Sequence, residues 1–200
     1  MHPSPFFAET DRARIAAIVR GNPFGILVSA DSQGMAATHI PFDLRETEQG
    51  WELWGHLAAG NGQCAGIAAG AEAMAVFSGP HAYVSPSWYA AGPAVPTWNY
   101  VAVTIWGRLE VVDDPAGGLE ALSAMDPVGF SVAGLDAEYR ARMFRGIRAF
   151  VLRAERVQAV WKMSQNKSEA DRAGVVAALR EQGGEGNRAV AELMAADLKS

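Results

Sequence analysis

The sequence has few features that could form a disulfide or anchor the chain in a membrane. Cys64 is its only cysteine, so no disulfide can form within the chain, and this usage is typical of a reducing compartment. No apolar run reaches the roughly 18 residues of a transmembrane helix. The first residues, MHPSPFFAETD, also lack the basic and apolar regions of a signal peptide. We therefore expect a cytoplasmic protein without a membrane segment.

Common signatures of catalytic and nucleotide sites are also missing. The chain has no GxGxxG after a predicted strand, no GxxxxGK[ST] loop and no GxSxG elbow. His39, His56 and His81 lie beside predicted strands, but they lack the HxH or HxxxH spacing and the nearby acids of a metal site. The sequence therefore predicts no metal centre and identifies no catalytic residue. Each histidine remains a candidate acid or base, because imidazole titrates near neutrality.

Charge is absent from a long stretch in the middle of the chain. Residues 77–100, FSGPHAYVSPSWYAAGPAVPTWNY, contain six aromatic residues and four prolines but no Asp, Glu, Lys or Arg. A solvated loop normally carries charge, and a central strand normally excludes proline, which has no backbone donor. Two interpretations are open. The segment plugs the chain's own core with Trp88, Tyr89 and Trp98, or it lies against a flat, apolar ligand or partner.

The hydrophobic pattern predicts one main domain with a helical appendage. Strands are expected over 24–30, 35–44, 51–57, 73–77, 100–112 and 146–152, and short helices over 10–22, 64–69, 116–125 and 139–144. Strands in hairpin order with helices between them predict an α+β fold built on a six-stranded antiparallel barrel. Helical patterns over 168–182 and 187–198 follow. We expect a barrel domain over 1–160 and a helical extension over 161–200 packed on it.

Neutral hydrogen-bonding residues recur on the predicted loops, next to aromatic ones. They are Thr38, His39, Asn61, Gln63, Ser85, Asn99, Ser164, Gln165 and Asn166. Such side chains can bond the edge of a heteroaromatic ring, while Lys162 and Lys167 can meet a phosphate. As a set they predict a flavin site. Taken singly, each also has a structural explanation as a strand-end, turn or capping residue.

Five segments resemble the PaiB family of FMN-binding negative transcriptional regulators. They are GHLAAGN at 55–61, FSGPHAYVSPSWY at 77–89, VPTWNYVAV at 95–103, WKMSQNKSEAD at 161–171 and NRAVAELM at 187–194. The resemblance implies a split β-barrel of the pyridoxamine-phosphate-oxidase type and a homodimer with FMN at its interface. The chain departs from the family pattern at Gly62, Cys64, Thr104 and Lys167.

The resemblance also assigns residues to the flavin by position. Thr38 and His39 would lie at the strand edge beside the flavin, and His56, Asn61 and Gln63 would lie nearest the ribityl-phosphate. The remaining matches are His81, Tyr83 and Ser85 in GPHAYVS, Trp98 and Asn99 in TWNY, and Lys162, Ser164, Gln165 and Asn166 in the K-x-S-Q-N box. In the family pattern, Trp98 and Asn99 would reach the flavin from the partner subunit.

Three functions follow from the resemblance and remain open. The first is an FMN-binding flavoprotein that acts as an oxidoreductase on a small molecule, with an unidentified electron donor. The alternative is a negative transcriptional regulator that uses FMN as a ligand or acts through a protein partner. Direct DNA binding has less support, because the arginines over 140–156 are split between a predicted helix and a strand without a helix-turn-helix pattern. A haem-handling protein is the third, although no histidine follows Lys162.

Overall fold

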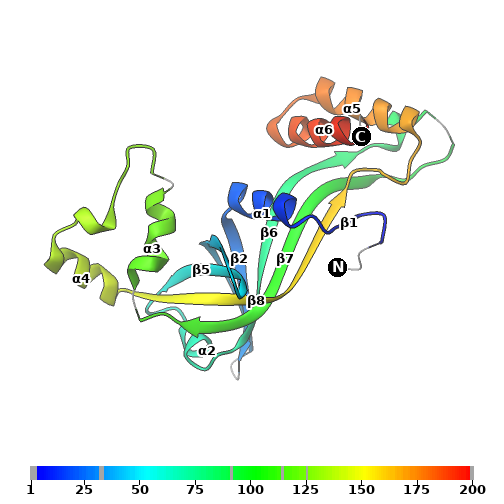
Figure 1. Cartoon of the computed structure of the whole chain (residues 1–200). Coiled ribbons are helices and arrows are strands. Elements are labelled where there is room, and N and C mark those ends of the chain that lie inside the picture. Colours follow the sequence, from blue (N-terminus) through cyan, green and yellow to red (C-terminus); the bar gives the residue numbers. More distant parts are fainter. Residues whose placement is uncertain (1–3, 32–33, 91, 114, 125, 199–200) are drawn as a thin grey trace. The chain divides into compact units, whose positions relative to one another are not determined.

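The computed structural model describes residues 4–31, 34–90, 92–113, 115–124 and 126–198. Its elements are β1 (Ala8–Glu9), α1 (Arg12–Gly21), β2 (Phe24–Asp31), β3 (Gly34–Pro41), β4 (Asp43–Thr47), β5 (Gly50–Ala58), α2 (Cys64–Ala68), β6 (Glu72–Val84), η1 (Pro86–Trp88), β7 (Thr97–Val111), α3 (Pro115–Ala124), η2 (Val132–Gly134), α4 (Ala137–Arg145), β8 (Ile147–Lys162), α5 (Glu169–Gln182) and α6 (Glu185–Asp197). The strands form one 8-stranded sheet in the order β3-β2-β6-β7-β8-β5-β4, with β1 paired to β8 (Figure 1).

The predicted α+β class is confirmed, but the sheet is larger than the six strands expected. The hydrogen-bonded path ends at β3 and β4, so the described strands form a split barrel rather than a closed one. One additional strand arises because the predicted return strand over 35–44 is interrupted between β3 and β4. Pro41 cannot donate to the ladder, and the next residue, Phe42, is buried with its ring 5.3 Å from that of Phe77. The other additional strand, the two-residue β1, was not predicted.

Two strands continue well past their predicted ends. β6 runs on through Pro80 to Val84, because a proline's fixed φ suits an extended strand and only its donor is lost. β8 was expected to end at Leu152, before a charged stretch. Those charges are accommodated by pairing: Arg153 bonds Glu52 and lies 2.9 Å from Glu110 on the neighbouring strands. Charge in this stretch therefore marks cross-strand pairs rather than the end of the strand.

The chain divides into two compact units, and β6, β7 and β8 each contribute a segment to both. The barrel unit comprises residues 16–77 and 104–157, and the helical unit comprises residues 1–15, 78–103 and 158–200. The domain boundary expected at residue 160 stays a prediction. Among the described residues, no helix combines the length and apolarity needed to cross a bilayer.

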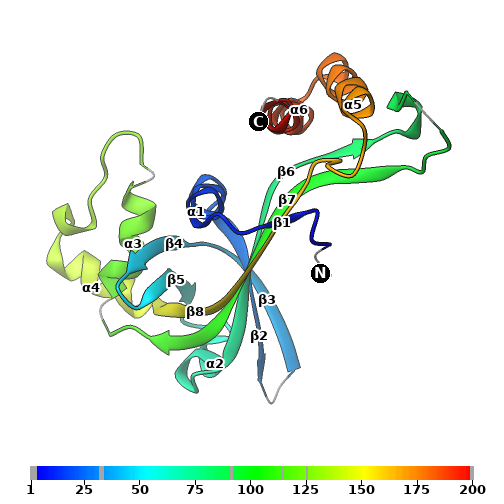
Figure 2. The same cartoon turned by 45° about the vertical axis from the view of Figure 1, so that its right-hand side comes forward.

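In the helical unit, α5 and α6 lie side by side (Figures 1 and 2). The spacing predicts inward faces of Val175, Val176 and Leu179 on α5 and of Val190, Leu193 and Met194 on α6. All are buried except Leu193, which is only partly buried. Ser168, the first residue of the helical pattern expected over 168–182, caps α5, because its Oγ accepts from the amide of Asp171 at 3.2 Å.

Helix α1 begins at Arg12, later than the start at residue 10 expected from the sequence. Asp11, and not Thr10, supplies the capping oxygen, which accepts from the amides of Ala13 and Arg14 at 2.8 and 3.3 Å. Two further predicted features reach residues outside the described ranges: the turn at Ser32 and Gln33, and the predicted last residue of the helix over 116–125, Met125.

The backbones of β7 and β8 approach each other closely at Gly107, so we expect an added methyl group there to lower stability strongly. A Cβ at Gly107 would lie 1.8 Å from the carbonyl oxygen of Arg153, a backbone atom that cannot retreat without moving β8. We expect Gly107→Ala to lower the free energy of unfolding by at least about 2 kcal/mol, measured by urea denaturation. Gly21→Ala is the matched control, since nothing lies within 4 Å of a Cβ there. Equal midpoints for the two variants would contradict the close approach.

Candidate functional site

The structure distributes the predicted site residues over both units. The barrel unit holds Thr38, His39, His56, Asn61 and Gln63. The helical unit holds His81, Tyr83, Ser85, Trp98, Asn99, Lys162, Ser164, Gln165 and Asn166. The two groups are built differently: the first is organised by a buried amide, and the second by an exposed aromatic face.

Gln63 organises the polar group in the barrel unit. Its side chain is buried, and its Nε2 donates to Ser29 Oγ at 2.8 Å and to the carbonyl of Ala36 at 3.2 Å. Its Oε1 accepts a short hydrogen bond from Thr38, whose hydroxyl accepts in turn from Asn61 Nδ2 at 3.1 Å. Gln63 therefore fixes the 60–63 loop against β2 and β3. Its side-chain donors and acceptor are already bonded within the chain.

The partly exposed members of this group are left facing open space. Asn61 and Thr38 are partly buried, and Gly60 and Gly62 beside them would have nothing within 4 Å of an added Cβ. His39 is exposed and stacks on Phe24 with ring centroids 6.1 Å apart. His56 is held differently, because its Nδ1 lies 3.1 Å from the carbonyl of Gly118 at the start of α3. Its ring anchors a helix to the sheet.

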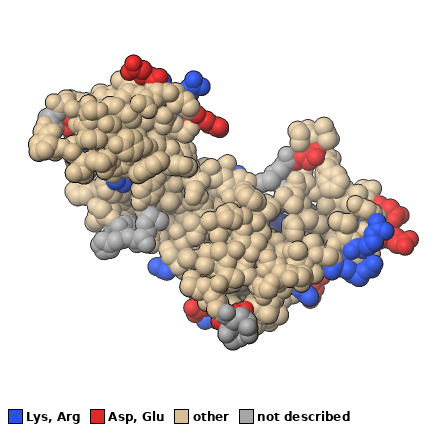
Figure 3. Space-filling model, turned by 180° about the vertical axis from the view of Figure 1, so that it is seen from behind, with Lys and Arg blue, Asp and Glu red and all other residues tan. Residues whose placement is uncertain are grey.

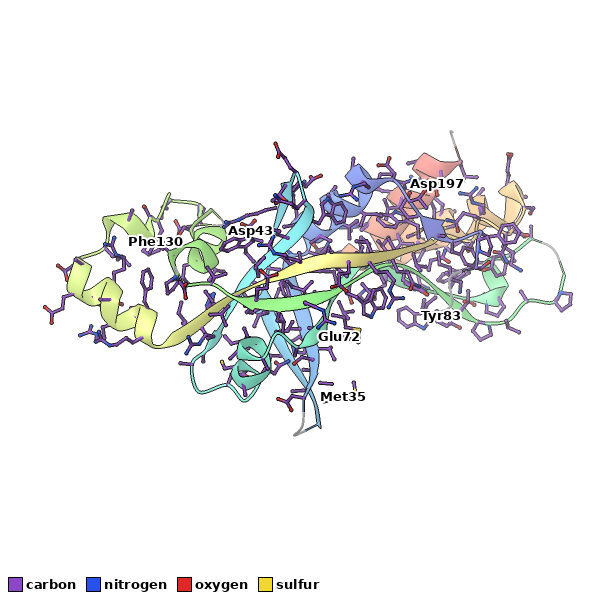
Figure 4. The ribbon with its side chains drawn as sticks, turned by 60° about the horizontal axis from the view of Figure 1, so that its bottom comes forward. Met35, Asp43, Glu72, Tyr83, Phe130 and Asp197 are labelled. Carbon is purple, nitrogen blue, oxygen red and sulfur yellow. The ribbon has the colours of Figure 1, made fainter. Side chains whose placement is uncertain are left out.

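Period-two alternation along β6 and β7 creates an aromatic face in the helical unit. Ala82 and Val84 point into the core, while His81 and Tyr83 between and beside them are exposed. The opposite strand presents Trp98, which is 53% exposed and whose ring lies 6.1 Å from His81 and 6.2 Å from Tyr83. Trp88 packs edge-on against Tyr83 at 6.3 Å. Figure 4 labels Tyr83 on this face. The self-plugging interpretation therefore does not hold for Trp98.

Asn99 lies on the opposite side of β7 from Trp98 and is fully buried. Its Nδ2 donates to Ser164 Oγ at 3.0 Å and approaches Met194 Sδ at 3.3 Å. The Ser164 hydroxyl also lies 3.2 Å from Asn99 Oδ1. This pair joins β7 to the turn after β8 and to α6, which gives both predicted site residues a structural role.

The K-x-S-Q-N box forms a tight turn held by one of its own side chains. Gln165 Oε1 accepts from the amide of Met163 at 2.7 Å, and its Nε2 donates to the carbonyl of Trp161 at 2.6 Å. Ser164 has φ of 59°, a left-handed conformation that is costly for a residue other than glycine. Asn166 is exposed. Within this box, Asn166 and Lys162 are the residues whose heads remain available to a ligand.

Lys162 ends β8 with its Nζ close to the hydroxyl of Thr97. Partial burial lowers the pKa of Lys162 from its ordinary value, because desolvation disfavours the charged form. Beside the box, the Lys167 ammonium lies 5.0 Å from the centroid of the Tyr89 ring. Ser85 caps η1, with its Oγ accepting from the amide of Ser87 at 3.3 Å. The helical unit thus combines a charge-free aromatic face with a partly desolvated cation.

Sequence reasoning missed three residues that support these groups. Ser29 accepts a hydrogen bond from Gln63. A lone hydroxyl inside the apolar run of β2 was the sequence feature that could have revealed it. Thr97 lies beside Lys162, and the signal was its place in the TWNY motif. Asp171 accepts from the amide of Ala90 at 2.7 Å, which ties the aromatic segment to α5. Nothing in the local sequence distinguishes Asp171 from any other acidic residue in the first turn of a helix.

The single cysteine and the histidines show no sign of metal or nucleophile chemistry in the described chain. No group of three His, Cys, Asp or Glu side chains within the described ranges lies close enough to hold a metal ion. Burial raises the pKa of the Cys64 thiol, an effect only partly offset by the nearby Arg148, and its Sγ lies 3.4 Å from the carbonyl of Ala58. A raised pKa keeps the thiol protonated at neutral pH.

Sequence comparisons identify relatives over the whole chain. The family described as "Putative FMN-binding domain" matches residues 1–156. The "Protease synthase and sporulation protein PAI 2" of Bacillus subtilis is 30% identical over 207 residues, which cover 100% of this chain and 99% of that protein.

Structural comparisons give the same fold at lower identity. The FAD and haem binding protein from Mycobacterium smegmatis superposes with a TM-score of 0.63 at 21% identity, covering 83% of this chain and 78% of that one. The flavocytochrome Anf3 from Azotobacter vinelandii superposes with a TM-score of 0.56 at 16% identity, covering 86% and 78%. These likenesses confirm the split-barrel fold class.

The buried amide network predicts that the stability losses caused by substitutions within it are not additive. Gln63→Leu leaves Ser29 and Thr38 without their partner, so we expect the free energy of unfolding to fall by about 2 kcal/mol in urea denaturation. The triple variant Gln63→Leu, Ser29→Ala, Thr38→Val removes the orphaned groups and should recover part of that loss. Gln49→Leu, on an exposed turn, is the control. A triple variant weaker by the sum of the single losses would refute the network.

Proposed function

This chain belongs to the FMN-binding family that includes the PaiB-type proteins, and on that premise we propose how it holds and uses the flavin. The predicted recognition, fold class and cofactor are confirmed at this level. We propose a homodimeric cytoplasmic flavoprotein in which the isoalloxazine ring lies against the aromatic face of His81, Tyr83 and Trp98. The observation that carries the proposal is the exposure of these rings within a segment that has no charged residue.

The fit of this face to a flavin rests on the chemistry of its side chains. An isoalloxazine ring is flat and largely apolar, with hydrogen-bonding atoms along its edges. Stacked and edge-on aromatic contacts stabilise such a ring without a full charge, and neutral donors can satisfy its edges. Asn166, in the same unit as these rings, has a polar head that the chain leaves exposed. Its amide would supply a neutral donor and acceptor. The contacts expected of Thr38 and Asn61, in the barrel unit, stay predictions.

The FMN phosphate needs a cation, and Lys162 is suited to provide it. Its partial burial weakens its hydration, and the neighbouring Thr97 hydroxyl can orient its ammonium. Lys167, exposed at the end of the box, would add a second positive charge. Asn99, Ser164 and Gln165 would act indirectly, by positioning the strand and the turn that present these groups.

A homodimer follows from the same exposed rings. An apolar aromatic face left open to water is unfavourable in a monomer and typical of an interaction surface. In the proposed dimer, a second copy and the flavin together cover Trp98 and Tyr83, which are 53% and 44% exposed in the single chain. We propose that the partner completes the flavin site.

Bound FMN supplies hydride or electron transfer, and the protein supplies binding, orientation and exclusion of water. His81 is the histidine exposed on this face, and its ring would contact the flavin there. An oxidoreductase acting on a small molecule is therefore our proposal for the activity. The regulator interpretation depends on the family resemblance alone and stays a prediction.

Removing the central ring tests the proposal directly. We expect the purified protein to show flavin absorbance or to quench FMN fluorescence on titration, and Trp98→Ala to weaken FMN binding at least about tenfold. Light scattering should show a dimer for the wild type and a larger monomer fraction for this variant.

The matched control is Phe6→Ala, which truncates an aromatic side chain that is 70% exposed in the same unit. It should bind FMN as the wild type does. Equal losses in both variants, or no flavin binding by the wild type under any condition, would reject the aromatic face as the flavin site.

Lys162 predicts a pH dependence. Protonated Lys162 attracts the phosphate and neutral Lys162 does not, so FMN affinity should fall as pH rises through the lowered pKa of this lysine. The fall should begin at lower pH than for an ordinary lysine. Fluorescence titrations above pH 7.5, where the phosphate is already doubly charged, would measure it. Lys162→Arg keeps its charge and should flatten the profile, and an unchanged slope in that variant would exclude Lys162.

A further inference from the structure

A groove opens in the barrel unit between α3, η2 and α4. One part of it has a volume of about 280 Å³ and is lined mainly by apolar side chains, among them Leu119, Leu122 and Leu135. A second part, of about 410 Å³, shares Phe130, Arg140 and Phe144 with the first, so the two are continuous. Neither part is lined by a residue predicted to contact the flavin.

The groove is not the closed core of a small helical layer. Phe130, Tyr139 and Met143 line it and are 48%, 44% and 48% exposed, although Val132 beside them is buried. Figure 4 shows Phe130 between the ribbons of α3 and α4. Large apolar side chains held half-open around a cavity are typical of a binding groove.

Arg140 is the cation of this groove and lines both of its parts. In the described chain, its guanidinium has no recorded hydrogen bond or ion pair. Arg142 and Arg145 follow on the same helix, and Arg142 lies over the Tyr139 ring at 5.1 Å. Figure 3 shows Lys and Arg atoms next to Asp and Glu atoms at the right-hand end of the face in view.

The nearby carboxylates are already engaged by backbone amides. Asp126 also lines the groove, and its Oδ1 accepts from the amides of Val128 and Phe130 at 2.8 and 3.3 Å. Asp136 caps α4 and accepts from the amides of Glu138 and Tyr139, both at 3.0 Å. Asp126 Oδ1 is thus engaged and its Oδ2 can still accept, whereas Arg140 is the groove's hydrogen-bond donor with a full positive charge.

We propose that this groove binds a small amphipathic carboxylate. Its apolar body lies among Leu119, Leu122 and Phe144, and its carboxylate accepts the paired N–H donors of Arg140, whose planar fork matches that geometry. A cavity of about 150 Å³ accommodates benzene, so the 280 Å³ part has room for one ring and a short chain. The site is separate from the flavin and does not depend on flavin binding.

Binding of 4-phenylbutyrate to the full-length protein tests the proposal, measured by calorimetry with and without FMN. We expect the same dissociation constant in both conditions, and binding about tenfold tighter than that of 4-phenylbutanol, which lacks the charge. Arg140→Gln should remove this tenfold preference. Arg145→Gln, which makes the same charge change on the same helix outside the groove, should alter binding less than about twofold.

A second measurement places the ligand independently of affinity. In a spectrum of ¹³C-methyl methionine, the Met143 signal should shift on saturation, while those of Met163 and Met194, buried in the helical unit, should not. The proposal fails if phenylbutanol binds equally, if 4-phenylbutylamine binds better, or if Arg145→Gln loses as much as Arg140→Gln. An unchanged Met143 signal also rejects it.

Discussion

The helical unit depends on the buried pair of Asn99 and Ser164. Each side chain gives the other a partner in a site buried from solvent, where an unpaired amide would cost about 1–3 kcal/mol. The pair fixes which way β7 faces. Because neighbouring residues on a strand point to opposite sides, burying Asn99 obliges Trp98 to point outward. The exposed aromatic face is thus the consequence of a polar contact on the other side of the strand.

The same contact explains why a strained turn is retained after β8. Ser164 has φ of 59°, and the two hydrogen bonds of Gln165 across the turn hold the backbone in that conformation. Serine is less suited to this conformation than glycine, but glycine has no hydroxyl for Asn99. In the K-x-S-Q-N box, Ser164 and Gln165 therefore hold the turn, and the turn orients Lys162 and Asn166.

The sequence predicted the elements whose signals are local and missed those whose signals are not. The faces of α5 and α6 follow from 3.6-residue spacing, and the cap at Ser168 follows from its position. The length of β8 was underestimated because Arg153 looks like a strand end until Glu52 and Glu110 are placed beside it. The role of Gln63 was likewise hidden, since its partner Ser29 is more than thirty residues away. The motifs named side chains that the structure uses in two ways: Asn99, Ser164 and Gln165 hold the fold, and Tyr83, Trp98 and Asn166 are exposed.

The groove between β7 and β8 in the sequence has two sides: α3 is held firmly against the sheet, and α4 is packed more loosely. Gly118 allows α3 to lie directly on the sheet, since a Cβ there would meet the carbonyl of Gly55 at 3.2 Å, and Arg45 bonds the carbonyl of Gly117 at 2.9 Å. Helix α4 has no buried residue of its own. Its position is set by its cap at Asp136 and by the start of β8. A groove with one anchored and one weakly packed side can adjust its width to an occupant at little cost, and Arg140 lies on the weakly packed side.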